Sequence, residues 1–193
     1  MYSAIKIIMV SLCILSFEHA FAQSERSNNN SIETGIHVAG DETLFYGANS
    51  KFIMPLSQKK HYPTLAHSLT ISLDRKGESE SRAYLKKAVD MRIMPALHLG
   101  YSLNFKNLQL NFEVPVGTSI AITKGTLINE RVGFERDYSN TELFWHYGLA
   151  FSPKYRLNKA NQIGLYGFLP LVPDKTSSGY LYGIGWTKSL IKK

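Results

Sequence analysis

The sequence predicts an all-β protein, an eight-stranded antiparallel up-and-down transmembrane β-barrel that follows a cleaved signal peptide. The first observation is the length of the apolar/polar alternation between Asp90 and Thr123, where two stretches of about 16 residues are joined only by Lys106-Asn107. Alternation with a period of two is typical of a strand, and soluble strands usually have about 5–6 residues. A tilted strand needs about 9–11 residues to cross the lipid. The length therefore favours a membrane barrel.

The second observation is where the aromatic residues lie. Tyrosine and tryptophan gather at membrane–water interfaces, and in this chain several aromatics fall near strand ends on the apolar face. The predicted aromatic belt is Tyr101, Phe105, Trp145, Tyr155, Tyr180 and Trp186.

The third observation is that the connections sort by length. One set is Ser57–Thr64, Lys106-Asn107 and Asn158–Asn161; the other is Gly40–Thr43, Asp74–Val89, Gly125–Asn140 and Pro173–Ser178. Two connections of the second set are long and charged, and we expect them to be structureless. Membrane barrels have short periplasmic turns, longer extracellular loops and an even number of strands.

The first element is a secretory signal. Lys6 gives a positive start, residues 7–17 form an apolar run, and Ala20-Phe21-Ala22 supplies a small-x-small cleavage pattern. The single cysteine, Cys13, lies inside this segment. We expect residues 1–22 to be the signal peptide, 23–33 a flexible leader, 34–190 the barrel and 191–193 a tail.

The barrel follows as eight strands. Their expected ranges are 34–39, 44–56, 65–73, 90–105, 108–123, 143–157, 162–171 and 180–190. The first is short and weak, the seventh is apolar on both faces, and the others alternate.

The polar faces of these strands are predicted to line the lumen, as a structural cluster without a catalytic role. Its members are Asp90, Arg92, His98, Glu113, His146 and Arg156. Charges enclosed together are tolerable only when they are paired. A soluble barrel has the reverse polarity, so a soluble periplasmic β-barrel that binds a small apolar ligand is an alternative. The aromatic placement favours the membrane.

Residues 34–190 resemble, in pattern, the small outer-membrane barrels of Gram-negative bacteria, the OmpA-like and OmpX-like class. The resemblance implies a cell outer-membrane protein in contact with lipopolysaccharide, inserted by the barrel assembly machinery and monomeric. The ending Leu190-Ile191-Lys192-Lys193 departs from the terminal aromatic usual in that class.

A second, fainter resemblance rests on short glycine–aromatic patterns. The segments Glu33-Thr34-Gly35, Tyr46-Gly47-Ala48 and Leu99-Gly100-Tyr101 are similar to parts of the cellulose-synthase-associated, BcsS-like barrel. This likeness implies an accessory of polysaccharide export.

Net charge gives a further clue to partners. Without Lys6 and Glu18 the 22 basic and 15 acidic residues become 21 and 14, so the net charge stays +7. Export argues against nucleic acid and favours anionic lipopolysaccharide phosphates or an acidic polysaccharide as counter-charges. We expect surface or envelope interaction through the long outer loops 74–89 and 125–140. Their candidate binding residues are Arg75, Lys76, Arg82, Lys86, Lys87, Arg131 and Arg136.

The residues predict no catalytic site, cofactor or metal. Adjacent His67 and Ser68 face opposite sides of a strand, so they cannot serve one site. The histidines His98 and His146 could approach each other in the lumen, but two histidines without a nearby carboxylate pair or cysteine do not predict a metal site. Eight strands also enclose too little space for a pore. A lipid A-modifying barrel is the enzymatic alternative.

Overall fold

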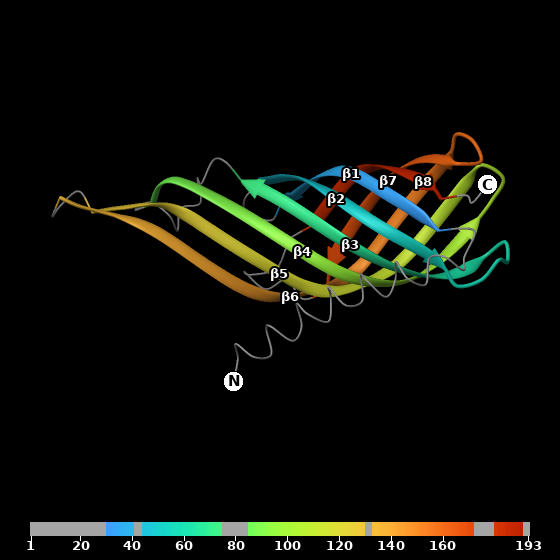
Figure 1. Ribbon diagram of the computed structural model, residues 1–193, viewed down its shortest axis with the longest axis horizontal. Coiled ribbons are helices and arrows are strands. Elements are labelled where there is room, and N and C mark those ends of the chain that lie inside the picture. The colour runs from blue at the N-terminus through green and yellow to red at the C-terminus, as the bar shows by residue number, and fades with distance from the viewer. Residues whose placement is uncertain (1–29, 41–43, 75–84, 130–132, 172–179, 191–193) are drawn as a thin grey trace.

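The computed structural model describes residues 30–40, 44–74, 85–129, 133–171 and 180–190. These residues form eight antiparallel strands that close into one barrel in sequence order (Figure 1). The strands are β1 (Ser31–Gly40), β2 (Leu44–Pro55), β3 (Tyr62–Asp74), β4 (Leu85–Asn104), β5 (Leu108–Asn129), β6 (Phe134–Arg156), β7 (Asn161–Pro170) and β8 (Tyr180–Ser189). The predicted fold class is confirmed. The described part of the chain contains no helix long and apolar enough to span a membrane.

Strand β1 closes the ring. All ten of its residues pair with β2 on one side and with β8 on the other. The strand begins at Ser31, three residues before the expected start, so Glu33 lies inside the barrel wall rather than in a leader. The predicted signal peptide, residues 1–22, lies outside the described residues.

The barrel has two different ends. At the turn end, β1 begins, β8 ends, and the connections at 56–61, 105–107 and 157–160 are short. Backbone hydrogen bonds close these turns, for example from Phe105 N to Leu108 O (2.7 Å). At the opposite end, which we call the loop end, three strands extend much further than the others (Figure 1).

These long strands correct the prediction of a structureless loop at Gly125–Asn140. Strands β4, β5 and β6 have 20, 22 and 23 residues. The β5–β6 ladder continues to the pair Asn129↔Phe134, and β4 already pairs with β5 at Leu85↔Leu127. Isoleucine and threonine at 120, 122, 123, 126 and 128 favour strand, and this preference outweighs the interspersed charges. We call this extension of β4, β5 and β6 the projecting sheet.

Three prolines explain three interruptions inside the ladders, and a fourth, the register shift of β4–β5 between Lys86 and Val89, contains no proline. Pro95 lies in a gap of the β4–β5 pairing, Pro115 in a gap of β5–β6, and Pro153 in a gap of β6–β7. Each still pairs in register with its other neighbour, as in Leu69↔Pro95. Proline has no N–H to donate to a ladder, so each of these three interruptions falls on the one side where that donor is missing.

The barrel wall is apolar outside and largely polar inside. Outward side chains such as Ile36 (70 % exposed), Leu99 (60 %) and Trp145 (60 %) leave large apolar areas uncovered. Glu33 and Lys154, in contrast, are only 1 % and 2 % exposed. Monomeric soluble proteins rarely expose contiguous apolar patches beyond a few hundred Å². This polarity is that of outer-membrane barrels, and it contradicts the soluble ligand-binding alternative.

Candidate functional sites in the lumen, on the outer face and at the rims

A network of four buried charges crosses the lumen. The ammonium of Lys51 on β2 lies 3.1 Å from both carboxylate oxygens of Glu113 on β5 and 3.8 Å from Glu33 on β1. Glu33 also binds the ammonium of Lys154 on β6. Thr187 of β8 donates to Glu33 at 3.4 Å. The two lysines balance the two glutamates, so the formal charges of these four side chains cancel.

The network extends through His98 to Ser68. The Nδ1 atom of His98 lies 2.8 Å from a carboxylate oxygen of Glu113, and its Nε2 atom lies 2.7 Å from the hydroxyl oxygen of Ser68. This connectivity is that of a serine–histidine–acid triad, with the acid on Nδ1 and the serine on Nε2. The His67–Ser68 pairing considered from the sequence is thus replaced by Ser68–His98.

Two layers of side chains, one on each side along the barrel axis, separate Ser68, His98 and Glu113 from the two ends of the lumen. Towards the turn end, Gln162 donates to Gln109 (2.9 Å), Gln109 to Asn111 (2.9 Å), and Ser102 to Asn111 (2.7 Å). Towards the loop end lies an apolar plug, an arrangement the predicted polar lumen did not include. Its members are Ala39, Phe45, Met94, Phe168 and Leu181.

The space left beside Ser68 is small. The lumenal cavity that includes Ser68, His98 and Glu113 has a volume of about 50 Å³. Small-molecule sites usually measure about 300–1,000 Å³. The same carboxylate is also held by Lys51, which competes for the charge that would activate His98. The arrangement ties strands together rather than admitting a substrate.

The predicted lumenal cluster is split by the structure. His98 and Glu113 lie in the charge network. His146 packs against Phe168 with ring centroids 4.5 Å apart, and Arg92 lies over the Phe45 ring at 4.2 Å. Asp90 accepts a hydrogen bond from Thr123 (2.6 Å) nearer the loop end.

Arg156 does not lie in the lumen. It is the last residue of β6 and is exposed at the turn end, where it lines an open bowl with turn residues. The alternation places Arg156 on the lumenal face of β6, as predicted. The strand ends at this residue, however, so the side chain extends beyond the lumen into solvent.

Three central residues were missing from the predicted cluster. Glu33 was assigned to the leader, although the alternation of β1 through His37 and Ala39 extends back to it. Lys51 shares a strand face with Asn49, and Lys154 shares one with Ser152. Only the closed ring shows that β2 faces β5 and that β1 faces β6 across the lumen.

All six predicted belt aromatics are 41–60 % exposed. Five of them lie on the strands, whereas Phe105 lies in the β4–β5 turn and lines the open bowl at the turn end. Tyr155 and Trp186 both pair with Ile163 and so form one row near the turn end. The Trp186 indole donates to Asn161 at 3.2 Å. Trp145 lies on the projecting sheet, three residues before the β6–β7 ladder begins at Gly148.

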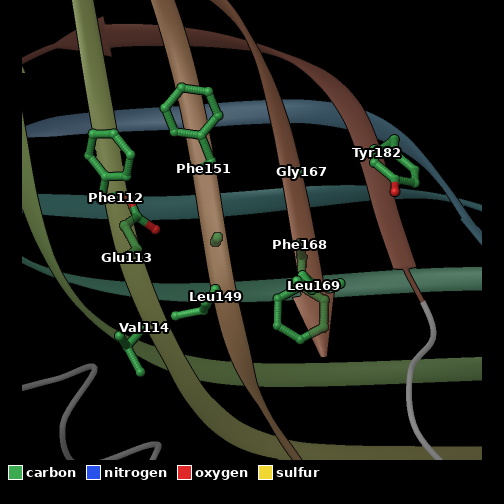
Figure 2. Close-up of a pocket in the computed structure, with 10 residues that line it drawn as sticks. Phe112, Glu113, Val114, Leu149, Phe151, Gly167, Phe168, Leu169 and Tyr182 are labelled. Carbon is green, nitrogen blue, oxygen red and sulfur yellow. The ribbon is translucent and has the colours of Figure 1, made fainter. Parts of the chain in front are cut away.

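An apolar groove of about 520 Å³ runs along the outer face between β5 and β8 (Figure 2). Gly167 causes it, because this residue pairs with Phe151 on one side and Tyr182 on the other and has no side chain between them. Phe112 and Phe151 line one wall with ring centroids 5.0 Å apart. Lipid chains around the barrel fit this apolar surface.

The structure describes three of the seven binding residues that were predicted for the long outer loops. Arg75, Lys76, Arg82 and Arg131 lie outside the described residues, whereas Lys86 and Lys87 lie in β4 and Arg136 in β6. Arg136 is exposed on the projecting sheet. Within the described ranges, no three histidine, cysteine or acidic side chains group as a metal site.

No family model and no curated protein sequence matches the chain. Among solved structures it is similar to Ail, the attachment invasion locus protein of Yersinia pestis, with TM-score 0.48 and 13 % identity over 84 % of this chain and 96 % of that chain.

Two further solved structures are similar. The N-terminal β-barrel domain of Pseudomonas aeruginosa OprF has a TM-score of 0.43 and 13 % identity over 84 % of this chain and 99 % of that one. The Neisserial surface protein A (NspA) has a TM-score of 0.40 and 10 % identity over 83 % and 95 %. The closed eight-strand ring and its polarity confirm the OmpA-like and OmpX-like fold class.

Proposed function

We propose that the protein is a non-enzymatic outer-membrane barrel that binds external partners through its projecting sheet. The observation that carries this proposal is the free edge of β6. The β6–β7 ladder begins at Gly148, and no described strand pairs with Phe134–His146 on the side away from β5. An exposed strand edge is a template for pairing with another chain.

The free edge of β6 is long, and its excess of negative charge favours a positively charged partner. Thirteen residues at about 3.4 Å each extend roughly 40 Å. Glu135, Asp137 and Glu142 outnumber Arg136 on this segment. A basic extended segment is therefore the favoured partner, because pairing it with the edge satisfies both the backbone groups and the excess negative charge.

The experiment shortens the projecting sheet without changing the barrel. Residues 124–139 are replaced by Asn-Gly, which joins the directly opposed Thr123 and Asn140 through a favoured hairpin turn. Cells that display the full-length chain are expected to adhere to immobilised serum and matrix proteins. The shortened chain is expected to adhere more weakly, because the replacement removes residues 134–139 of the edge and leaves 140–146.

A second variant separates the contribution of the free strand edge to adherence from the contribution of its negative charge. The pair Glu135→Gln and Glu142→Gln keeps the edge and removes two charges, so adherence is expected to fall only partly. Equal adherence by the shortened and full-length chains, with both folded in the membrane fraction, would disprove the proposal. The lipid A enzyme and cellulose-export alternatives have no described site in their favour.

A further inference from the structure

A concave basic bowl occupies the turn end of the barrel. It has a volume of about 660 Å³, which falls within the usual range of ligand sites. Three separate turns converge on it: Lys59 and Lys60 come from the β2–β3 turn, Lys106 from β4–β5, and Arg156 and Lys159 from the end of β6 and the turn after it.

The described residues leave the charge of this bowl uncompensated. No acidic residue is among the described residues that line it, and all five cations are exposed. The nearest acidic side chains along the turn-end halves of the described strands are Glu33 and Glu113, which the lumenal lysines already bind. Concave surfaces lined by one sign of charge concentrate counter-charged ligands.

The floor of the bowl is neutral and closed. Gln109 and Gln162 line it and are hydrogen-bonded to each other at 2.9 Å. A ligand therefore rests on amides and is held by a ring of cations instead of entering the lumen. Because the three turns form this end of the barrel and the five cations are exposed, their charges are accessible from the compartment beyond the turns.

We propose that this bowl binds an acidic peptide segment of a periplasmic partner, on the opposite side of the membrane from the projecting sheet. Short turns of outer-membrane barrels lie in the periplasm. Five cations from three turns can be matched by several carboxylates on one flexible chain, whereas a single phosphate reaches only a few of them. The inference is independent of the proposed adhesion at the loop end.

The test uses the full chain refolded in a zwitterionic detergent and fluorescent hexaglutamate, with binding followed by anisotropy. Binding is expected at low salt and is expected to weaken as salt rises. The variants K59Q/K60Q and R156Q/K159Q are each expected to lower affinity about 2- to 25-fold, the range for two exposed ion pairs. The control K124Q/R136Q removes two exposed cations of the projecting sheet and is expected to leave affinity unchanged.

Several results would overturn the proposal. These are unchanged affinity in both turn-end variants, equal loss in the control, or equal binding of hexalysine. Inorganic phosphate that displaces hexaglutamate at an equal concentration of negative charge would show that the bowl binds any small anion and has no preference for a peptide. Loss of peptide binding in nanodiscs containing anionic lipid, but not in zwitterionic ones, would assign the cations to the bilayer surface. Unaltered gel mobility of each variant before heating confirms that the barrel is folded.

Discussion

At the scale of single residues, the decisive feature is charge pairing in the lumen. Lys51 and Glu113 are each 5 % exposed and hold each other at 3.1 Å. Removing one partner of such a pair leaves a buried charge without compensation, whereas replacing both can be almost neutral. Replacing either residue alone is therefore expected to destabilise the barrel more than replacing both.

The first prediction concerns this pair. Glu113→Gln and Lys51→Met are each expected to lower the free energy of unfolding by about 3–5 kcal/mol, measured by urea titration in lipid vesicles. The double variant is expected to lose much less than the sum, because neither charge remains. The control Glu142→Gln removes an exposed carboxylate and is expected to stay within about 0.5 kcal/mol. Additive losses would contradict the pairing.

Ser68 gives a second residue-scale prediction. Its hydroxyl has triad-like contacts, but the adjoining cavity measures about 50 Å³. We expect no covalent labelling of the folded barrel by a fluorophosphonate, and a loss of about 1 kcal/mol of stability for Ser68→Ala from the lost hydrogen bond. Labelling that disappears in Ser68→Ala would instead reveal a reactive serine and revive the enzymatic alternative.

At the scale of elements, close strand contacts depend on particular glycines. A Cβ at Gly117 would lie 2.1 Å from the Pro95 carbonyl oxygen, whereas at Gly167 nothing lies within 3.7 Å. Gly117→Ala is therefore expected to destabilise the barrel by about 1–3 kcal/mol through overpacking, and Gly167→Ala to be tolerated while narrowing the outer groove. Urea unfolding of both variants checks this. Equal stability would show that β4 and β5 can separate locally.

The free edge of β6 makes another element-scale prediction. Amides of Phe134–His146 that point away from β5 have no described partner, so alternate residues of this segment are expected to exchange hydrogen rapidly. Amides of β5 in the barrel are expected to be protected, because β4 and β6 flank them. Residue-resolved exchange in detergent tests it. Uniform protection along β6 would mean that the edge is already covered.

At the scale of the whole molecule, the closed ring with its apolar plug predicts a folded barrel without a pore. The purified protein is expected to migrate differently on a gel before and after boiling, because a closed ladder resists cold detergent. Planar bilayers that contain it are expected to show no stable single-channel conductance, as eight strands leave only space that side chains fill. Steady single-channel conductance would contradict this prediction, because it would require a continuous water path through the apolar plug.

The sequence by itself determined the fold class, the strand number and the two faces of most strands. These follow from a period of two, which is a local property of the backbone that each segment shows independently. Asp90–Asn104 and Leu108–Thr123 could be placed in this way because their alternation is long. The sequence also placed the belt aromatics on the apolar face, since that assignment needs only the parity of each position.

Tertiary structure decided the remainder, because it depends on which strands face each other. Only closure of β1 on β8 brings Glu33 to Lys154 and Lys51 to Glu113, pairs separated by 121 and 62 positions in the chain. Pairing of β5 with β6 converted an expected loop into the projecting sheet. Convergence of three turns produced the basic bowl. Long-range pairing sets these contacts, and no local pattern of charge or hydrophobicity encodes it.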